Sequence, residues 1–510
     1  MLLPIKDCGK GVNKDLPAHE LALGMWSDAL NIEFDGATWR RRSGIQSAYT
    51  TPTAIAYYLQ SYVTASARFL VQAGLSSIFV DDGTTRTDIT GPVPTGTRSN
   101  RWTGGDYNGV LILNNGVDAP MYWNGDVATD LATLTAWPAG YKADTVRPFL
   151  DFLIAGAVTK NTGIKYPQLL MWSSPSDPGA VPSTWAAAAT NQAGDDPMTG
   201  KGAIIDMLPF GAVNVIYCQQ GRVAMRYVGG EAVFAFDPMP GADGLMATGC
   251  VVETPKGHVF LSNGDVLIHN GGEATSIAED RIRNWLFSTI DPTNGLNAFL
   301  VANPQRAEVW VCFPKVGSTE CDRAAVWNWV SDTWAIYSLP NVTYAASGVV
   351  PPLSVGTWAN DSETWDSDAS TWDQNEYGNN EAKLILATST PTLGVANSGS
   401  TDFGSSVSQL LERKGIKPDE TDAMMVLSKS RWPVAGIAAN TLTIFHGTHK
   451  LADTDPEYAT SATHTQGTTD WVTRRTNRGR YLAIKMTSTT SQPLSGRSVS
   501  LEYEVVGRYG

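Results

Sequence analysis

Short apolar runs separated by turn residues recur along most of the chain, and residues 249–277 show this pattern most clearly. An Asn263-Gly264 pair lies between two of the apolar runs, and both central residues of a type I′ hairpin turn need a positive φ, which Asn and Gly tolerate. The pattern therefore predicts an antiparallel meander. Its three strands are expected at Cys250–Glu253, His258–Leu261 and Asp265–His269.

Similar units recur between about residue 50 and residue 340, and six of them follow one another at spacings of roughly 40 to 60 residues. Each unit has room for three or four short strands, which favours an all-β fold built on a β-propeller of about six blades. A β-sandwich or jelly roll is the alternative, but over this length it would need two domains. The other units lie at 67–80, 108–123, 148–172, 213–236 and 298–339.

The units suggest four parts of the chain. Residues 1–25 are expected to form an extended arm, and residues 26–340 the propeller. Residues 341–380 form an acidic connecting segment, and residues 381–510 an additional C-terminal β-sandwich-like module. One helix is expected at Ala278–Phe287, where acidic residues precede apolar ones.

The connecting segment carries Trp358, Trp365 and Trp372 at a spacing of seven residues. Asn, Asp, Ser and Gly fill the gaps between them, so a coiled coil is not expected. We interpret the three indoles as candidate interface aromatics that lie on a neighbouring surface.

Three consecutive arginines, Arg40, Arg41 and Arg42, lie on a predicted hairpin, after its turn at Asp35-Gly36. Alternate residues of a strand point to opposite faces, so the three do not share one side. Two interpretations remain open: pairing with carboxylates of the same chain, or contact with a partner such as a neighbouring subunit, an adaptor or phosphate. We take the three as candidate subunit or adaptor contacts.

Charge and composition narrow the function. The 510 residues carry a net charge of −13, and charged residues make up 17% of the chain, below the roughly 25% that is typical. With 17 Trp, this suggests an exterior largely covered by partners. An acidic chain is poorly suited to binding nucleic acid.

No apolar run of about 18 residues is present, so no membrane-spanning segment is expected, and the chain is expected to be made in the cytoplasm.

Catalytic and metal motifs are not evident. The five cysteines are scattered, with no CxxC pair, although Cys312 and Cys321 could meet across a hairpin. His446 and His449 would not share a face of a strand, and Asp366-Ser367-Asp368 lacks the Gly and Glu of an EF-hand loop. These patterns therefore predict no metal site and provide no candidate catalytic residue.

Three groups of stretches resemble tail nozzle, or tail hub, proteins of short-tailed bacteriophages, a family also described as tail tubular or DNA-stabilisation-like. The opening hairpin SDALNIEFDGATWRRRSGIQ is similar to theirs, and the late units and the C-terminal end keep the family's order. Residues 50–200 contribute little to the resemblance. The remaining similar stretches are 257–287, 303–314, 324–340 and 479–510.

The resemblance implies a structural virion protein of the tail, assembled in the host cytoplasm, with no enzymatic activity and no cofactor. Its subunits would form a ring, expected to be a homohexamer, below the portal and adaptor. The ring would continue the DNA ejection channel and contact tail fibre or spike proteins, and DNA would pass without sequence-specific binding. The alternative is a propeller glycosidase or glycan-binding protein acting on host surface polysaccharide. Only Asp35–Trp39 is close to the sialidase Asp box, once and with different spacing.

Overall fold

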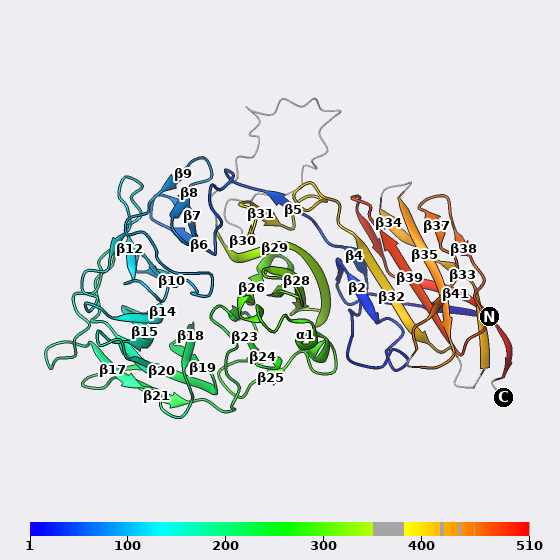
Figure 1. The fold of residues 1–510 in the computed structure, drawn as a ribbon. Coiled ribbons are helices and arrows are strands. Elements are labelled where there is room, and N and C mark those ends of the chain that lie inside the picture. Colours follow the sequence, from blue (N-terminus) through cyan, green and yellow to red (C-terminus); the bar gives the residue numbers. More distant parts are fainter. Residues whose placement is uncertain (350–381, 419–422, 437–439, 453, 509–510) are drawn as a thin grey trace.

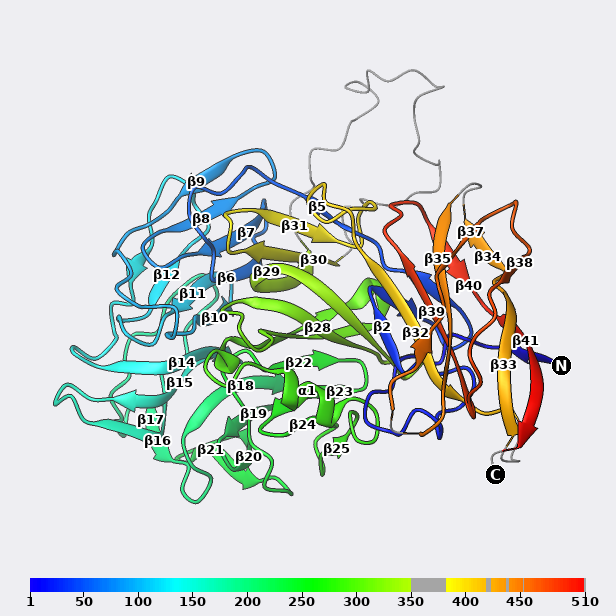
Figure 2. The same ribbon diagram turned by 45° about the vertical axis from the view of Figure 1, so that its right-hand side comes forward.

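The computed structural model describes residues 1–349, 382–418, 423–436, 440–452 and 454–508. It shows a ring of antiparallel blades beside a β-sandwich (Figures 1 and 2). Five blades are separate four-stranded sheets. Blade 1 comprises β6 (Tyr58–Val63), β7 (Arg68–Ala73), β8 (Ile78–Asp81) and β9 (Arg86–Asp88). Blade 2 comprises β10 (Thr103–Tyr107), β11 (Val110–Asn114), β12 (Met121–Trp123) and β13 (Ala132–Thr133).

The next three blades repeat this order from the axis outward. Blade 3 comprises β14 (Lys142–Phe149), β15 (Phe152–Thr159), β16 (Lys165–Trp172) and β17 (Gly194–Pro197). Blade 4 comprises β18 (Ile204–Phe210), β19 (Val213–Cys218), β20 (Gly221–Gly229) and β21 (Val233–Pro238). Blade 5 comprises β22 (Val251–Thr254), β23 (Gly257–Ser262), β24 (Asp265–His269) and β25 (Thr275–Ser276). In blade 5, Ser262 pairs with Asp265 around the Asn263-Gly264 turn, which confirms the predicted hairpin.

A seven-stranded sheet forms the rest of the ring, and it contains two blades that share one strand. Blade 6 comprises β26 (Phe299–Asn303), β27 (Glu308–Phe313), β28 (Cys321–Asn328) and the first half of β29 (Thr333–Val349). The second half of β29 pairs instead with β30 (Ala382–Thr388), after a register shift at Val342/Tyr344. Blade 7 continues with β31 (Leu393–Ala396) and ends on β5 (Ile45–Ser47).

The second half of β29 is the inner strand of blade 7, because it contacts the inner strands on both sides. The ring of Tyr344 lies 5.2 Å from that of Tyr58 in blade 1 and 5.1 Å from that of Phe299 in blade 6. Thr343 donates its hydroxyl to the carbonyl of Ala56 at 2.6 Å. The all-β propeller is therefore confirmed, and the structure adds a seventh blade that an N-terminal strand completes.

The sandwich is built from both ends of the chain. One sheet has the order β1-β41-β33-β38, the other β2-β32-β39-β35-β36 with β37 beside β35, and a small sheet has the order β3-β4-β40-β34. The N-terminal strands are β1 (Leu2–Ile5), β2 (Asp28–Leu30), β3 (Ile32–Phe34) and β4 (Trp39–Arg41). The C-terminal strands are β32 (Gln409–Ile416), β33 (Ala423–Arg431), β34 (Val434–Gly436), β35 (Thr441–His449), β36 (Glu457–Tyr458), β37 (Ala462–Thr465), β38 (Trp471–Thr473), β39 (Tyr481–Ser488), β40 (Leu494–Gly496) and β41 (Val499–Arg508).

These pairings correct three of the expected boundaries. Residues 1–25 are not simply an arm, because β1 is an edge strand paired with β41. Residues 26–41 belong to the sandwich rather than to the propeller, since β2 pairs with β32 and β4 with β40. Residues 342–349 and 382–396 belong to blade 7. The apolar pattern identifies strands, but it carries no information on which distant edge a short strand will join.

The helix is shorter than predicted. It is α1 (Arg283–Thr289), and the preceding residues form turns. The carboxylate of Asp15, in the N-terminal segment, accepts hydrogen bonds from the backbone N–H groups of Asn284 and Trp285 at 2.9 and 3.0 Å, which satisfies donors that the first helical turn leaves free. Two short 3-10 turns are η1 (Gly295–Asn297) and η2 (Pro304–Arg306). Within the described residues, no helix is long and apolar enough to cross a membrane.

Candidate functional site

The axis of the propeller is filled by an ion pair. Arg147 on β14 donates from Nε and Nη2 to the two carboxylate oxygens of Asp206 on β18, at 3.0 and 2.9 Å. Arg147 Nη1 also reaches the carbonyl of Gly104 on β10, and the backbone N–H of Gly249, just before β22, donates to Asp206 at 3.0 Å. The pair thus ties the inner parts of four blades together. It fills the place where a channel through the ring would run.

Asp206 has no free lone pair with which to act as a base. Besides Arg147 and Gly249, its carboxylate accepts hydrogen bonds from the hydroxyl of Thr145 at 3.2 Å and from the N–H of Met207 at 2.9 Å. A carboxylate offers about four acceptor positions, and these are occupied. We therefore assign the Arg147–Asp206 pair to holding the blades in place, not to proton transfer.

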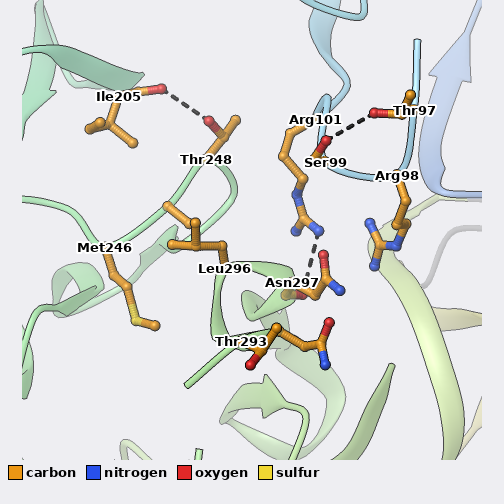
Figure 3. A pocket seen from close by; sticks show the side chains of 12 residues that line it. Thr97, Arg98, Ser99, Arg101, Ile205, Met246, Thr248, Thr293, Leu296 and Asn297 are labelled. Atoms are coloured by element: carbon orange, nitrogen blue, oxygen red, sulfur yellow. Dashed lines mark hydrogen bonds between the residues drawn. The ribbon is translucent and has the colours of Figure 1, made fainter. Parts of the chain in front are cut away.

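A hollow of about 540 Å³ lies at the mouth of the axis (Figure 3). Its wall comes mainly from three segments, 97–101, 246–248 and 293–297, with Ile205 between them. Each segment immediately precedes an inner strand, namely β10, β22 or β26. The hollow is therefore built where three connections between blades converge on the axis.

Two arginines face this hollow, and they differ in their hydrogen-bond partners. Arg98 forms a two-point pair with Glu320, at 3.0 Å from Nε and 2.8 Å from Nη2, and lies 4.8 Å above the ring of Tyr57. Arg101 meets only two backbone carbonyls, of Asn297 at 3.4 Å and Ala298 at 3.3 Å. Burial, and then the neighbouring charge of Arg98, lower the pKa of Arg101. Arg101 is thus a half-buried cation that donates to backbone carbonyls and not to a carboxylate.

The remaining lining residues have no acidic member. Four of them carry hydroxyl groups and two carry amides: Thr97, Ser99, Thr248, Thr293, Asn294 and Asn297. Apolar side chains such as Met246 and Leu296 form the opposite wall (Figure 3). Ligand sites are typically hollows of about 300–1,000 Å³ with a few placed polar groups, and this one has that size and lining. Its chemistry favours binding, because it offers hydrogen-bond donors and a cation but no general base.

A second buried cluster consists of two histidines joined by a tyrosine. The hydroxyl of Tyr217 lies 2.9 Å from His258 Nδ1 and 2.7 Å from His269 Nε2. His258 Nε2 lies 3.0 Å from the carbonyl of Pro209, and the N–H of Gly271 donates to His269 Nδ1. These partners fix both rings as neutral. Each group donates one hydrogen bond to the next, from Gly271 through His269, Tyr217 and His258 to the carbonyl of Pro209.

The pKa shifts agree with that assignment. Burial lowers the pKa of His258 to about 4, and burial together with the charges of Arg222 and His258 lowers that of His269 to about 3. Over the described part of the chain, no group of three His, Cys, Asp or Glu side chains could hold a metal ion. The cluster is a satisfied hydrogen-bond chain of blades 4 and 5. His446 and His449 hydrogen-bond to separate partners, the carbonyls of Arg474 and Leu451. The two histidines are three residues apart on one strand, so their side chains point to opposite faces.

The three arginines of the hairpin are placed very differently from one another. Arg40 is half-exposed and pairs with Glu33 at 3.0 Å. Arg41 is buried and donates to the carbonyl of Ser400. Arg42 is buried and pairs with Asp402. The assignment of all three as subunit or adaptor contacts is therefore wrong for Arg41 and Arg42, because residues near 400 fold over them; only Arg40 could face a partner.

Two other expectations have different outcomes. Trp358, Trp365 and Trp372 lie outside the described residues. Cys312 and Cys321 are both buried and free, so the bridge between them is absent.

Sequence reasoning missed the arginines and the aspartate of the axis. Arg98, Arg101, Arg147 and Asp206 lie in unrelated sequence contexts, and only ring closure brings them together. One signal was available: Arg98 and Arg101 stand in the connection between two predicted blades, and such connections converge on the axis of a propeller.

No known family model matches the sequence, and no curated protein matches it. Among solved structures, one similar chain is the extracellular domain of a hybrid two-component system from B. thetaiotaomicron, with 9% identity and a TM-score of 0.37. The match covers 69% of this chain and 39% of that one, so it spans well under half of that protein. Another is the WD40 β-propeller domain of Doa1, with 9% identity, a TM-score of 0.36, and coverage of 69% of this chain and 96% of that one.

Proposed function

We propose that this chain is a structural subunit of a virion tail, which assembles into a ring of six below the portal and adaptor and continues the channel for DNA. One observation supports this most directly. The stretches that resemble tail nozzle proteins are scattered over residues 27–510, yet they lie together in space.

A single hydrophobic core joins these stretches. Trp39 from the hairpin, Phe260 and Trp334 from the late blades, and Leu482 and Leu501 from the C-terminal end belong to the same core. The blades that contribute little to the resemblance have separate cores between neighbouring blades. The resemblance therefore follows one continuous structural unit, which is what common descent of a scaffold would produce.

Direct contacts within this unit support the same view. Asn31 donates its N–H to the carbonyl of Ile336 at 2.8 Å, and Thr333 donates its hydroxyl to the carbonyl of Phe34 at 3.0 Å. On its other side, the hairpin pairs Trp39 with Gly496. The hairpin thus joins blade 6 to the C-terminal strands.

The filled axis refines the proposal. Because Arg147 and Asp206 meet on the axis of each propeller, DNA would run between subunits rather than through a ring of blades. The net charge of −13 per subunit would keep phosphates from adhering to such a lumen.

The test is the mass of the purified chain, alone and with its adaptor, by native mass spectrometry, followed by negative-stain imaging. Six-fold rings with either sample support the proposal, and a strict monomer in both overturns it. Arg40→Gln probes the one exposed arginine of the hairpin and removes its ion pairs with Glu33 and Asp35. Arg226→Gln on blade 4, another exposed and ion-paired arginine, is the control. The glycosidase or glycan-binding alternative predicts instead hydrolysis or retention of host polysaccharide by the isolated chain.

A further inference from the structure

The hollow at the propeller mouth contains an enclosed arginine that has no anionic partner. Arg101 is enclosed between the connections to blades 2, 5 and 6, and its hydrogen bonds go to two carbonyls at 3.3 and 3.4 Å. A guanidinium has five N–H donors, so most of its donor capacity remains available to a ligand. Burying a cation without an anionic partner is costly, and a bound anion would offset that cost.

The charge around Arg101 is locally positive, although the chain as a whole is acidic. The carboxylates nearby are already paired: Glu320 with Arg98 and Asp206 with Arg147. None of the twelve residues that line the hollow is acidic. One positive charge therefore remains without a counter-charge at the mouth of the axis.

The rest of the wall indicates what else the ligand carries. The hydroxyls of Thr97 and Ser99 lie 2.9 Å from each other and flank the arginines (Figure 3). Thr293 and Thr248 add hydroxyl oxygens from the other two connections, and the Thr248 hydroxyl donates to the carbonyl of Ile205 at 3.1 Å. Leu296 and Met246 supply an apolar side. A compact molecule with several hydroxyl groups and an apolar face suits this lining, and about 540 Å³ accommodates a single sugar ring with its substituents.

We propose that this hollow binds a sugar-sized organic anion, with its one carboxylate or phosphate on Arg101 and its hydroxyl groups on the threonine and serine side chains. The site is separate from any contact between subunits, and the proposal does not rest on ring formation. A monomeric chain could bind the anion, and a ring could form without it.

The test is isothermal titration of the full chain with four probes. Glucuronate carries a sugar carboxylate and glucose 6-phosphate a sugar phosphate, glucose is the neutral control, and inorganic phosphate is the bare anion. We expect at least one sugar anion to bind, and which of the two binds more tightly identifies the acidic group. Equal binding of glucose, equal binding of inorganic phosphate, or no binding of either sugar anion at about 10 mM overturns the proposal.

Two variants locate the site. Arg101→Gln removes the charge, and losing a charge-assisted hydrogen bond is expected to weaken binding about tenfold or more. Leu296→Trp fills the hollow from a residue that is 64% exposed, so it is expected to block binding without disturbing the core. Arg226→Gln, remote on blade 4 and exposed, is the control and should leave the affinity unchanged. If both site variants bind as the unaltered chain does, the hollow is not the site and the proposal is wrong.

Discussion

The guanidinium of Arg42 forms a two-point ion pair with the carboxylate of Asp402, a residue 360 positions further along the chain. Arg42 is almost fully buried, and it also donates to Asn31 at 2.9 Å and lies 5.6 Å above the ring of Tyr337. This pair ties the hairpin to the segment between blade 7 and the sandwich.

Replacing Arg42 with Gln should destabilise the fold, because it leaves the Asp402 carboxylate enclosed without its partner. Breaking a buried pair from one side costs about 3–5 kcal/mol, which urea denaturation would measure. Arg226→Gln is the control: Arg226 and its partner Asp237 are both exposed, and the loss of this pair should cost less than about 1 kcal/mol. Equal losses in the two variants would contradict the assignment.

The histidine chain predicts a loss of stability in acid. Each histidine accepts a hydrogen bond on one nitrogen, so protonation breaks the chain. The unfolded pKa is about 6.5, whereas the folded values are about 4 for His258 and about 3 for His269. The stabilisation is therefore complete above pH 6.5. It is lost as the pH falls from 6.5 toward the folded pKa values, and each histidine then removes about 1.4 kcal/mol of stability per pH unit.

Denaturation midpoints between pH 7 and 4 would show this slope. In the double variant His258→Gln/His269→Gln the slope should decrease but not vanish, because burial also lowers the pKa of His446, His449 and His464. His19→Gln, at an exposed histidine of the N-terminal segment, should leave the slope unchanged. An unchanged slope in the double variant would place the acid sensitivity elsewhere.

A buried carboxyl predicts the opposite dependence at the junction of blade 6 and the hairpin. Burial, and then the charge of Glu33, raise the pKa of Glu308 to about 7, although Trp310 Nε1 donates to it at 2.9 Å. Because the folded pKa lies above the unfolded one, this group costs no stability below about pH 4.5 and an increasing amount as the pH rises to 7.

Glu308→Gln removes the titrating group and keeps an acceptor for Trp310. The variant should gain stability relative to the unaltered chain at pH 8, and the gain should shrink toward zero near pH 4.5. Paired thermal melts at the two pH values measure the difference. A gain of the same size at both would show that packing, and not ionisation, is responsible.

Closure of blade 7 depends on a close approach between β31 and β5. A Cβ atom at Gly394 would lie 2.5 Å from the side chains of both Ile45 and Phe403. Gly394→Val should therefore push β5 away and cost about 1–3 kcal/mol, with faster proteolysis near residues 45–50. Gly272→Ala, where the nearest atom lies at 3.9 Å, is the control. Unchanged proteolysis in Gly394→Val would mean that β5 does not hold the ring closed.

The sequence was sufficient for the fold class and for local hairpins, because both depend on neighbouring residues. Both hairpins were found where the pattern predicts them. In each turn the glycine has a positive φ, whereas Asn263 does not, and the carboxylate of Asp35 also accepts hydrogen bonds from the N–H groups of Ala37 and Thr38. Six of the blades could be predicted because each is formed by one continuous stretch of the chain, so the blades appear as a repeat in the sequence.

The seventh blade and the buried arginines could not be predicted, because both depend on distant segments. Blade 7 draws on residues 45–47, 342–349 and 382–396, so it leaves no unit in the repeat. Arg41 looks like a surface residue until Ser400 is known to lie over it. The axial hollow could not be predicted for the same reason. Arg101 lines a hollow only because Leu296 and Thr248, from distant parts of the sequence, lie opposite it.

The pairing of β1 with β41 has a consequence for how the protein is made. Residues 499–502 leave the ribosome long after Leu2–Ile5, so β1 waits for its partner while some 490 residues are added. At about 5–20 residues per second that interval is roughly half a minute or longer. The early blades can condense within it, because their strands are close in sequence. Strand β1 meanwhile keeps an open edge, and the sandwich becomes complete only once β41 has been synthesised.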